Sequence, residues 1–116
     1  MATITIKLGN EADLIIDEPN SASSGDRAII VTSAIAQAFS DSTSLSPSTR
    51  TGFLPITIGS KVFRIYYELR VKRIMNALTA YSEAISHIEQ NPHLYDQRLA
   101  RKAIEVLREC YNDRLG

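Results

Sequence analysis

The strongest pattern in this sequence is a set of apolar residues spaced alternately by four and three positions between residues 67 and 88. That spacing puts the side chains on one face of an α-helix, and it predicts an amphipathic helix from about Glu68 to Gln90. The ring of Pro92 cannot continue a helix, so we expect an end before it. The apolar face consists of Tyr67, Val71, Ile74, Leu78, Tyr81, Ile85 and Ile88.

This apolar face can pack against other parts of the same chain or against a second copy of the chain. Alanines at 77 and 84 stand where a two-stranded coiled coil prefers charges, which favours packing inside a globule. A second amphipathic helix at Tyr95–Leu115 can lie antiparallel to the first one. A second copy of the chain is the alternative, because symmetric dimers are the commonest oligomers. The seven residues are therefore candidates for a partner or self-interface, and Ile74→Asp with Ile85→Asp would dissociate such a dimer without unfolding it.

Two β-hairpins are expected. Polar and apolar residues alternate in Thr3–Leu8 and a second strand follows at Leu14–Asp17, with a loop longer than two residues between them. The segments Phe53–Ile58 and Lys61–Tyr67 flank Gly59-Ser60, which is typical of a two-residue hairpin turn. Pro55 cannot donate a ladder hydrogen bond, so its strand should lie at a sheet edge or begin late.

Residues 27–39 fit two structures. The β-branched residues from Ile29 to Thr32 suit a strand, whereas the apolar spacing and the alanines that follow suit a helix. We favour a helix over Arg27–Phe39, with Asp26 or Ser24 accepting a backbone hydrogen bond at its start.

The segment Ser40–Thr51 has Ser or Thr at eight of twelve positions and predicts an exposed, mobile loop. Ser46 precedes Pro47 and offers a phosphorylation site, although a plain spacer is the favoured interpretation. The element order is then β-β-α-β-β-α-α. It indicates one α+β domain over residues 1–116, in which an antiparallel sheet of two hairpins packs with one short helix and a C-terminal helical hairpin.

Composition narrows the function classes. Thirteen basic residues balance thirteen acidic ones, so the chain lacks the overall positive field of a strong nucleic-acid binder. One cysteine allows no internal disulfide, which favours the cytoplasm. The first residues alternate in polarity, unlike a signal peptide, and the longest apolar run, Ala28–Val31, is too short to cross a membrane.

Candidate chemistry is sparse. Gly59-Ser60-Lys61 resembles the end of a phosphate-binding loop only in part, and a hairpin turn explains it better. Cys110 lies beside apolar residues of the last helix and is expected to be a small buried hydrophobe.

Two groups of ionisable residues were weighed as metal or acid–base sites, and for both groups we favour solvated side chains. The first group is His87, Glu89, His93 and Asp96, and the second is Glu11, Asp13, Asp17 and Glu18. The sequence therefore predicts no catalytic residue, no metal and no cofactor, and it leans against an enzyme.

The clearest positive signal for binding is the segment from Arg64 to Arg73, in which basic and aromatic residues interleave. Guanidinium groups contact phosphates and aromatic rings stack on bases. The possible nucleic-acid contacts are Arg64, Tyr66, Arg70, Lys72 and Arg73.

The sequence favours a small, non-enzymatic, cytoplasmic binding or adaptor protein. It would act through protein–protein contacts and self-associate through the long amphipathic helix. A small nucleic-acid-binding regulator that uses residues 64–73 is the alternative, and no membrane contact is expected.

Overall fold

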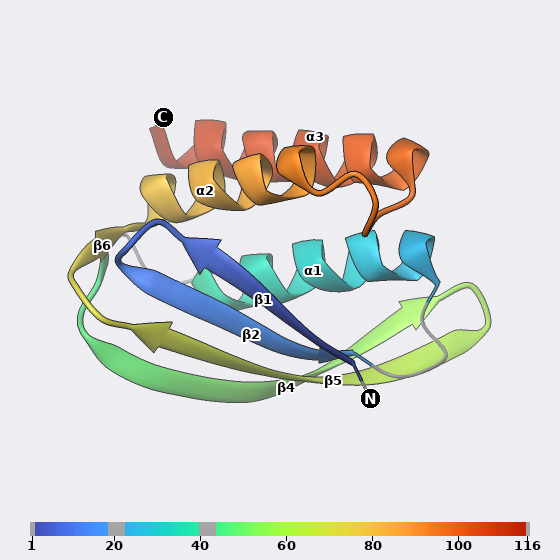
Figure 1. Ribbon diagram of the computed structural model, residues 1–116, viewed down its shortest axis with the longest axis horizontal. Helices are drawn as coiled ribbons and strands as arrows, with labels where there is room; N and C mark the ends of the chain where they lie inside the picture. Colours follow the sequence, from blue (N-terminus) through green and yellow to red (C-terminus); the bar gives the residue numbers. More distant parts are fainter. Residues whose placement is uncertain (1, 19–22, 40–43, 116) are drawn as a thin grey trace.

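The computed structural model describes residues 2–18, 23–39 and 44–115. It has the α+β class that the sequence predicts, with an antiparallel sheet and a C-terminal pair of helices (Figure 1). The elements in chain order are β1 (Ala2–Leu8), β2 (Ala12–Glu18), α1 (Ser24–Phe39), β3 (Ser44–Leu45), β4 (Ser48–Ile58), β5 (Lys61–Val71), β6 (Met75–Asn76), α2 (Ala77–Gln90) and α3 (Gln97–Leu115).

The main sheet has four antiparallel strands in the order β1-β2-β5-β4. Both predicted hairpins are present in it. β1 and β2 are joined by the three residues 9–11, and β4 and β5 by Gly59-Ser60. Gly59 has φ of 62°, the positive value that a tight two-residue turn requires. β4 is an edge strand, as Pro55 predicts. The short strands β3 and β6 form a second, two-stranded sheet.

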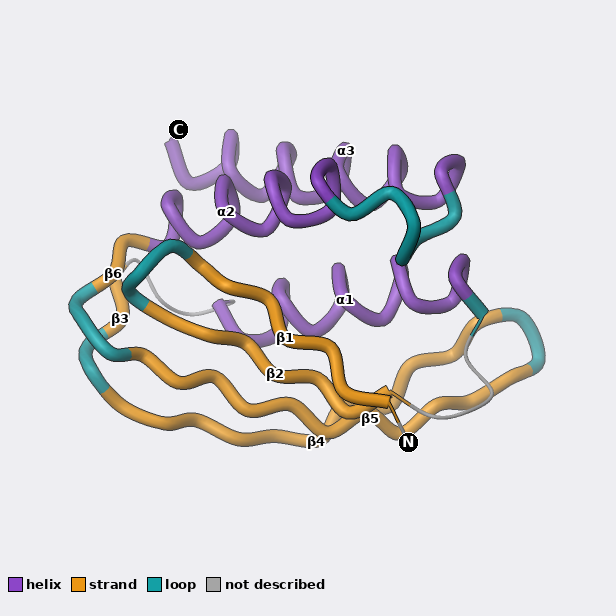
Figure 2. Tube along the Cα trace, viewed as in Figure 1, coloured by secondary structure: helices purple, strands orange, loops and turns teal. Residues whose placement is uncertain are grey.

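The helices cover one face of the main sheet and form two further layers, as Figures 1 and 2 show. α1 packs on β2, β4 and β5, and α2 packs along β1. α3 packs against both helices and lies farthest from the sheet. The core lies between the sheet and the helices. Successive side chains of each strand point alternately toward the helices and toward the uncovered face of the sheet. In β1, for example, Ile4, Ile6 and Leu8 are buried while the residues between them are exposed.

The helix predicted at Arg27–Phe39 is confirmed, and it begins slightly earlier, at Ser24. Ser23 and Asp26 cap its start together, and Asp26 accepts a backbone hydrogen bond as predicted, while the side chain of Ser24 lies outside the described ones. The Ser23 hydroxyl accepts a hydrogen bond from the Asp26 N–H at 3.1 Å, and the Asp26 carboxylate accepts one from the Ser23 N–H at 3.3 Å.

The helix predicted at Glu68–Gln90 is wrong in its first third. β5 continues to Val71, a turn follows, and α2 begins only at Ala77. The side chain of Asn76 caps α2 by accepting a hydrogen bond from the Leu78 N–H at 2.7 Å.

Strand pairing explains this difference. Residues 66–71 of β5 have β2 on one side and β4 on the other, so both rows of backbone groups are paired. Beyond the strand, the N–H groups of Lys72 and Arg73 both donate to the Glu11 carbonyl, at 2.6 and 3.2 Å. The burial pattern of this segment also has the two-residue repeat of a strand, since Ile65, Leu69 and Val71 are buried on one face.

The loop predicted at Ser40–Thr51 is also wrong in part. Residues 40–43 lie outside the described residues, Ser44–Leu45 forms β3, and Ser48–Thr51 begins β4. The extension of β5 to Val71 supplies the hydrogen-bonding partner that the sequence pattern did not reveal, because Ser48 pairs with Val71. The side chains of residues 48–51 are exposed, as expected.

We expect Asn76→Ala to destabilise the protein by about 1 kcal/mol, because it removes the N-cap of α2. Inside a continuous helix from residue 68 the same change would stabilise by about 0.5 kcal/mol, because Ala is the better helix former. Urea unfolding followed by circular dichroism measures the sign. Asn112→Ala, an exposed position within α3, is the matched control.

Candidate functional site

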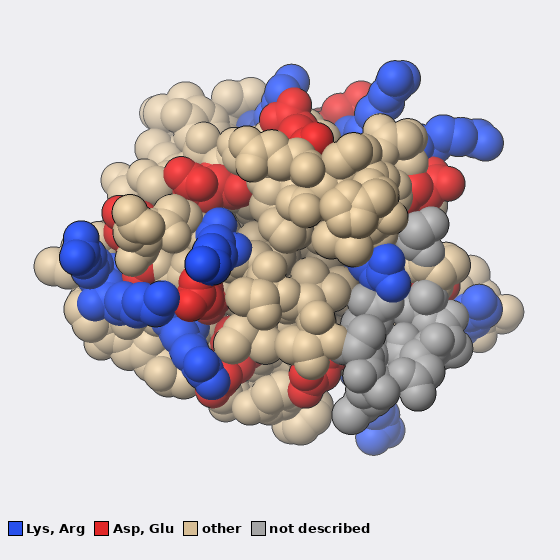
Figure 3. Space-filling view, viewed as in Figure 1, with Lys and Arg blue, Asp and Glu red and all other residues tan. Residues whose placement is uncertain are grey.

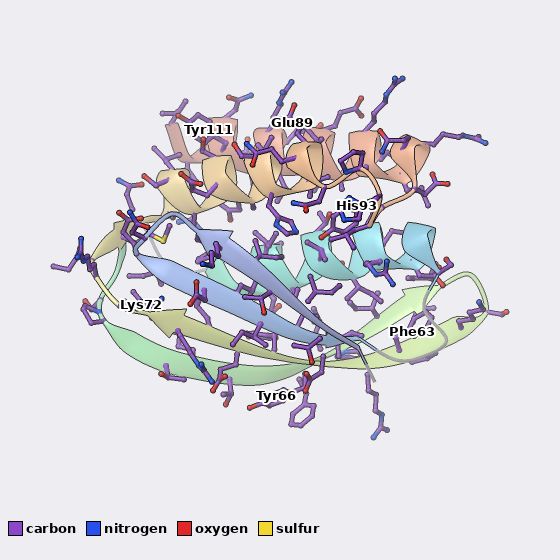
Figure 4. All side chains as sticks on the ribbon, viewed as in Figure 1. Phe63, Tyr66, Lys72, Glu89, His93 and Tyr111 are labelled. Atoms are coloured by element: carbon purple, nitrogen blue, oxygen red, sulfur yellow. The ribbon has the colours of Figure 1, made fainter. Side chains whose placement is uncertain are left out.

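The outer face of the sheet, which the helices leave uncovered, carries most of the predicted nucleic-acid contacts. Arg64, Tyr66 and Arg70 alternate with buried residues of β5 and project from this face. Figure 4 shows Tyr66 pointing away from the helices. Lys72 and Arg73 lie in the turn after β5, and both are exposed. The five residues therefore belong to a strand and a turn, not to a helix.

The structure adds Phe53 to this face. It stands opposite Tyr66 on β4, with the ring centroids 5.1 Å apart and the ring planes at 57°. The Phe53 side chain is 77% exposed, more than any other large apolar side chain that the structure describes. Phe53 is not among the contacts predicted from the sequence, although the two-residue turn at Gly59-Ser60 determines the register of this pair.

Ion pairs divide the outer face in two. Near β2, Arg70 pairs with Glu68 at 2.9 Å and Lys72 pairs with Asp13 at 2.9 Å. Residues 44–67 contain no Asp or Glu, so no acid of this segment neutralises Arg64 beside the aromatic pair. Elsewhere the two signs are mixed: Figure 3 shows basic and acidic side chains interspersed over the visible surface.

The outer edge of β4 has backbone groups without a partner. The Lys72 N–H points toward the β1–β2 loop, so even-numbered residues of β5 face β2 and odd-numbered ones face β4. In the β4–β5 register, the N–H and C=O groups of Thr49, Thr51, Phe53 and Thr57 then point away from the sheet. Among the described residues, no strand or helix pairs with this edge (Figure 1).

Pro55 is the remaining odd-numbered residue in this part of β4, and it has no backbone N–H to donate. The opposite edge strand, β1, has α2 packed along it. β4 also has a helix packed on it, α1, whose residues 33, 36 and 37 lie against residues 54–57.

The seven residues predicted as one apolar face are distributed over three elements. Tyr67 and Val71 lie on the helix-facing side of β5, Ile74 is 74% exposed in the turn, and the remaining four belong to α2. They do not form one helical face. A self-interface through them stays a prediction, and of the seven Ile74 is the one exposed side chain.

Most of this set packs inside the chain. Tyr81 and Ile88 are each 2% exposed and Val71 is 5% exposed. The Tyr81 ring meets Phe39 edge-on at 5.9 Å, and Arg114 from α3 reaches both the Tyr81 ring and the Phe39 carbonyl. Burial raises the pKa of Tyr81. Through these contacts Tyr81 of α2 connects α1 with α3.

Tyr67 also has an internal role. Its ring lies so close to Gly52 that a Cβ added there would come within 2.7 Å of the Tyr67 hydroxyl. Gly52 is therefore the residue that lets the Tyr67 ring cross the edge strand on the helix-facing side.

The histidine corner has a structural arrangement. His87 Nε2 lies 2.8 Å from the Tyr95 hydroxyl, and the two rings meet edge-on. Burial lowers the pKa of His87. His93 and Glu89 are exposed, and the Asp96 carboxylate caps α3 by accepting from the N–H groups of residues 98 and 99. Among the described residues, no group of three His, Cys, Asp or Glu side chains is placed to hold a metal ion.

The other candidates have ordinary surroundings. Cys110 is half-buried, and burial with the nearby Asp113 and Glu109 raises its pKa, which keeps the thiol protonated. Asp13 is taken by Lys72, and the Asp17 carboxylate accepts a hydrogen bond from Thr3 at 3.3 Å. Glu11 is half-buried in the β1–β2 loop, whereas the side chain of Glu18 lies outside the described ones.

Comparisons of the chain with protein-family models, curated proteins and solved structures found no match. Within the described residues, no helix is both long enough and apolar enough to cross a membrane.

We expect the stability of the fold to decrease as the pH falls below 6.5, the ordinary value for histidine. Because the pKa of His87 is lower in the folded state, the unfolded chain binds the proton first and acid favours unfolding. The urea midpoint measured at pH 7.5 and 5.5 should show this decrease. His87→Gln should reduce the difference, whereas a change of the exposed His93 to Gln should not.

Proposed function

We propose that this chain is a non-enzymatic binding protein that pairs another polypeptide with the open edge of β4. The observation that carries the proposal is an eleven-residue edge strand with a row of unpartnered backbone donors and acceptors. Such an edge is a template for an added strand, and natural proteins cover or blunt their edges when no partner is intended. Along Thr49–Phe53 no acidic or proline residue blunts this edge.

The side chains beside the edge support the same function. Phe53 has Tyr66 on its β5 side and, among the described residues, no strand on its free side, so a strand added there would cover the exposed flank of the ring. Tyr and Arg are enriched at the energetic centres of protein interfaces, and Tyr66 and Arg64 supply both types here. Backbone pairing would provide affinity, and these side chains would provide selectivity.

The edge supports this function better than the helical face does, because Val71, Tyr81 and Ile88 are already covered by the chain itself. The single cysteine fits a reducing compartment, and we assign the protein to the cytoplasm on that ground.

The test is a selection of binding peptides from a random library, followed by mapping of the bound peptide through backbone amide shifts in NMR. We expect the selected peptides to shift the amides of Thr49, Thr51 and Phe53 most. Thr51→Pro, which removes one outward N–H, should weaken binding about tenfold. Thr51→Val keeps that N–H and the side-chain shape, so it is the matched control. Peptides that shift only helical amides, or that bind Thr51→Pro equally well, would contradict the proposal.

Nucleic-acid binding is a second candidate function, favoured by the acid-free segment around Arg64, Tyr66 and Phe53. If it occurs, a fluorescent single-stranded oligonucleotide should bind with an affinity that falls steeply with salt. Arg64→Ala should weaken binding about tenfold. Arg70→Ala should change it less than about twofold, because Glu68 already neutralises that guanidinium. Binding that does not depend on salt would rule this function out.

A further inference from the structure

We propose that the strand added at the β4 edge is the β4 strand of a second copy of this chain, antiparallel to the first and centred on Thr51. This inference rests on the proposed function, since it names the partner for the same edge. The two copies would form one continuous sheet about a two-fold axis perpendicular to it, with their helices on the same side.

The positions of two prolines select this register. Pro47 and Pro55 each lie four residues from Thr51, just before β4 and within it. When two copies pair about Thr51, each Thr51 faces its counterpart and Thr49 faces Phe53. Pro47 then faces Pro55, where neither residue has an N–H to lose. All three residues from 49 to 53 that point outward find a partner with both a donor and an acceptor.

Other two-fold registers set a proline opposite one of the outward-pointing residues 49–53, although those centred on residue 52 or 53 also bring Thr57 into the pairing. A shift of the centre toward the turn sets Pro55 opposite Thr49, Thr51 or Phe53, and the carbonyl of that residue then lacks a donor. A shift the other way sets Pro47 opposite one of the same residues. Because the even-numbered residues of β4 are already paired with β5, they cannot replace the missing groups.

Side chains fit the same arrangement. On the outer face, Phe53 would stand next to Thr49 of the second copy, an aromatic and β-branched pair that stabilises neighbouring strands. On the other face, Arg50 would stand next to Gly52 of the second copy, over which the Tyr67 ring of that copy lies. Two arginines would therefore not meet across the axis.

The helices leave room for this contact. α1 reaches β4 near Leu54–Thr57, where residues 33, 36 and 37 line a shallow hollow against the strand. Ser48 and Arg50, on the same side of β4 but close to the proposed axis, are exposed. The two copies of α1 would therefore lie at opposite ends of the joined strands. The contact is small compared with the roughly 1,000 Å² of a stable interface, so a weak dimer is expected.

The test measures the weight-average mass by sedimentation equilibrium from about 10 µM to about 1 mM. The wild-type mass should rise from 12.9 kDa toward twice that value. Thr51→Lys alone and Thr51→Glu alone should stay monomeric, because like charges would face each other across the axis. An equimolar mixture of these two variants should recover the dimer, since opposite charges then face each other.

Controls separate this register from other contacts. The same two substitutions at Thr57, an exposed residue of β4 beyond Pro55, should leave the wild-type dimer unchanged. Ile74→Asp should also leave it unchanged, since Ile74 lies in the turn after β5. Because Glu68 stands opposite position 51 on β5, each variant is first checked for its urea midpoint.

Each outcome of the sedimentation experiments either supports or overturns the proposed dimer. A mass of 12.9 kDa at every concentration overturns it, while peptides that pair with β4 would still uphold the proposed function. A dimer that survives Thr51→Lys but not Ile74→Asp overturns it in favour of the turn and helical residues. A dimer lost in both single variants and recovered in their mixture supports it, because only self-facing residues give that result.

Discussion

The structure depends on β5 being hydrogen-bonded on both sides. β2 takes up the even-numbered backbone groups of residues 66–70, and β4 takes up the odd-numbered ones. Through this strand the N-terminal hairpin and the second hairpin become one sheet. Its buried side chains, among them Phe63, Ile65 and Leu69, face the helical layers. The carbonyl of Glu11 then receives the N–H groups that follow the strand, which fixes where the chain turns toward α2.

The same strand separates the molecule into two surfaces with different properties. On the helical side, Tyr81, Phe39 and Arg114 join three helices, and a cluster of buried apolar residues fills the core. On the outer side, Asp13 and Glu68 neutralise two of the basic groups that the sequence offers for binding. Phe53, Tyr66 and Arg64 are left beside an edge that, in the described chain, has no neighbour.

Much of this fold can be predicted from the sequence, because its signals are local. Alternation and turn residues predict both hairpins, Pro55 predicts the edge, and alanine-rich spacing predicts α1. The long helix fails for a specific reason: Tyr67 and Val71 are four residues apart, which satisfies the helical repeat and the strand repeat alike. Pairing with distant strands decides between the two, and no local pattern contains that information.

The candidate site was predictable only in part. The interleaving of basic and aromatic residues predicts Arg64 and Tyr66, and the register of the hairpin adds Phe53. The ion pairs of Arg70 and Lys72 join β5 and its turn to other parts of the sheet, so they require the fold. The open edge is also invisible in the sequence, because it depends on which strand comes last in the sheet and on what lies beyond it.

The packing of α2 along β1 has a consequence for growth. A sheet with two exposed edges can add chain after chain and extend into a fibre. Here one edge strand is flanked by a helix and the other is bounded by prolines. Two-fold pairing at β4 uses that edge in both copies, so any growth of the sheet beyond two chains would have to occur at β1, beside α2.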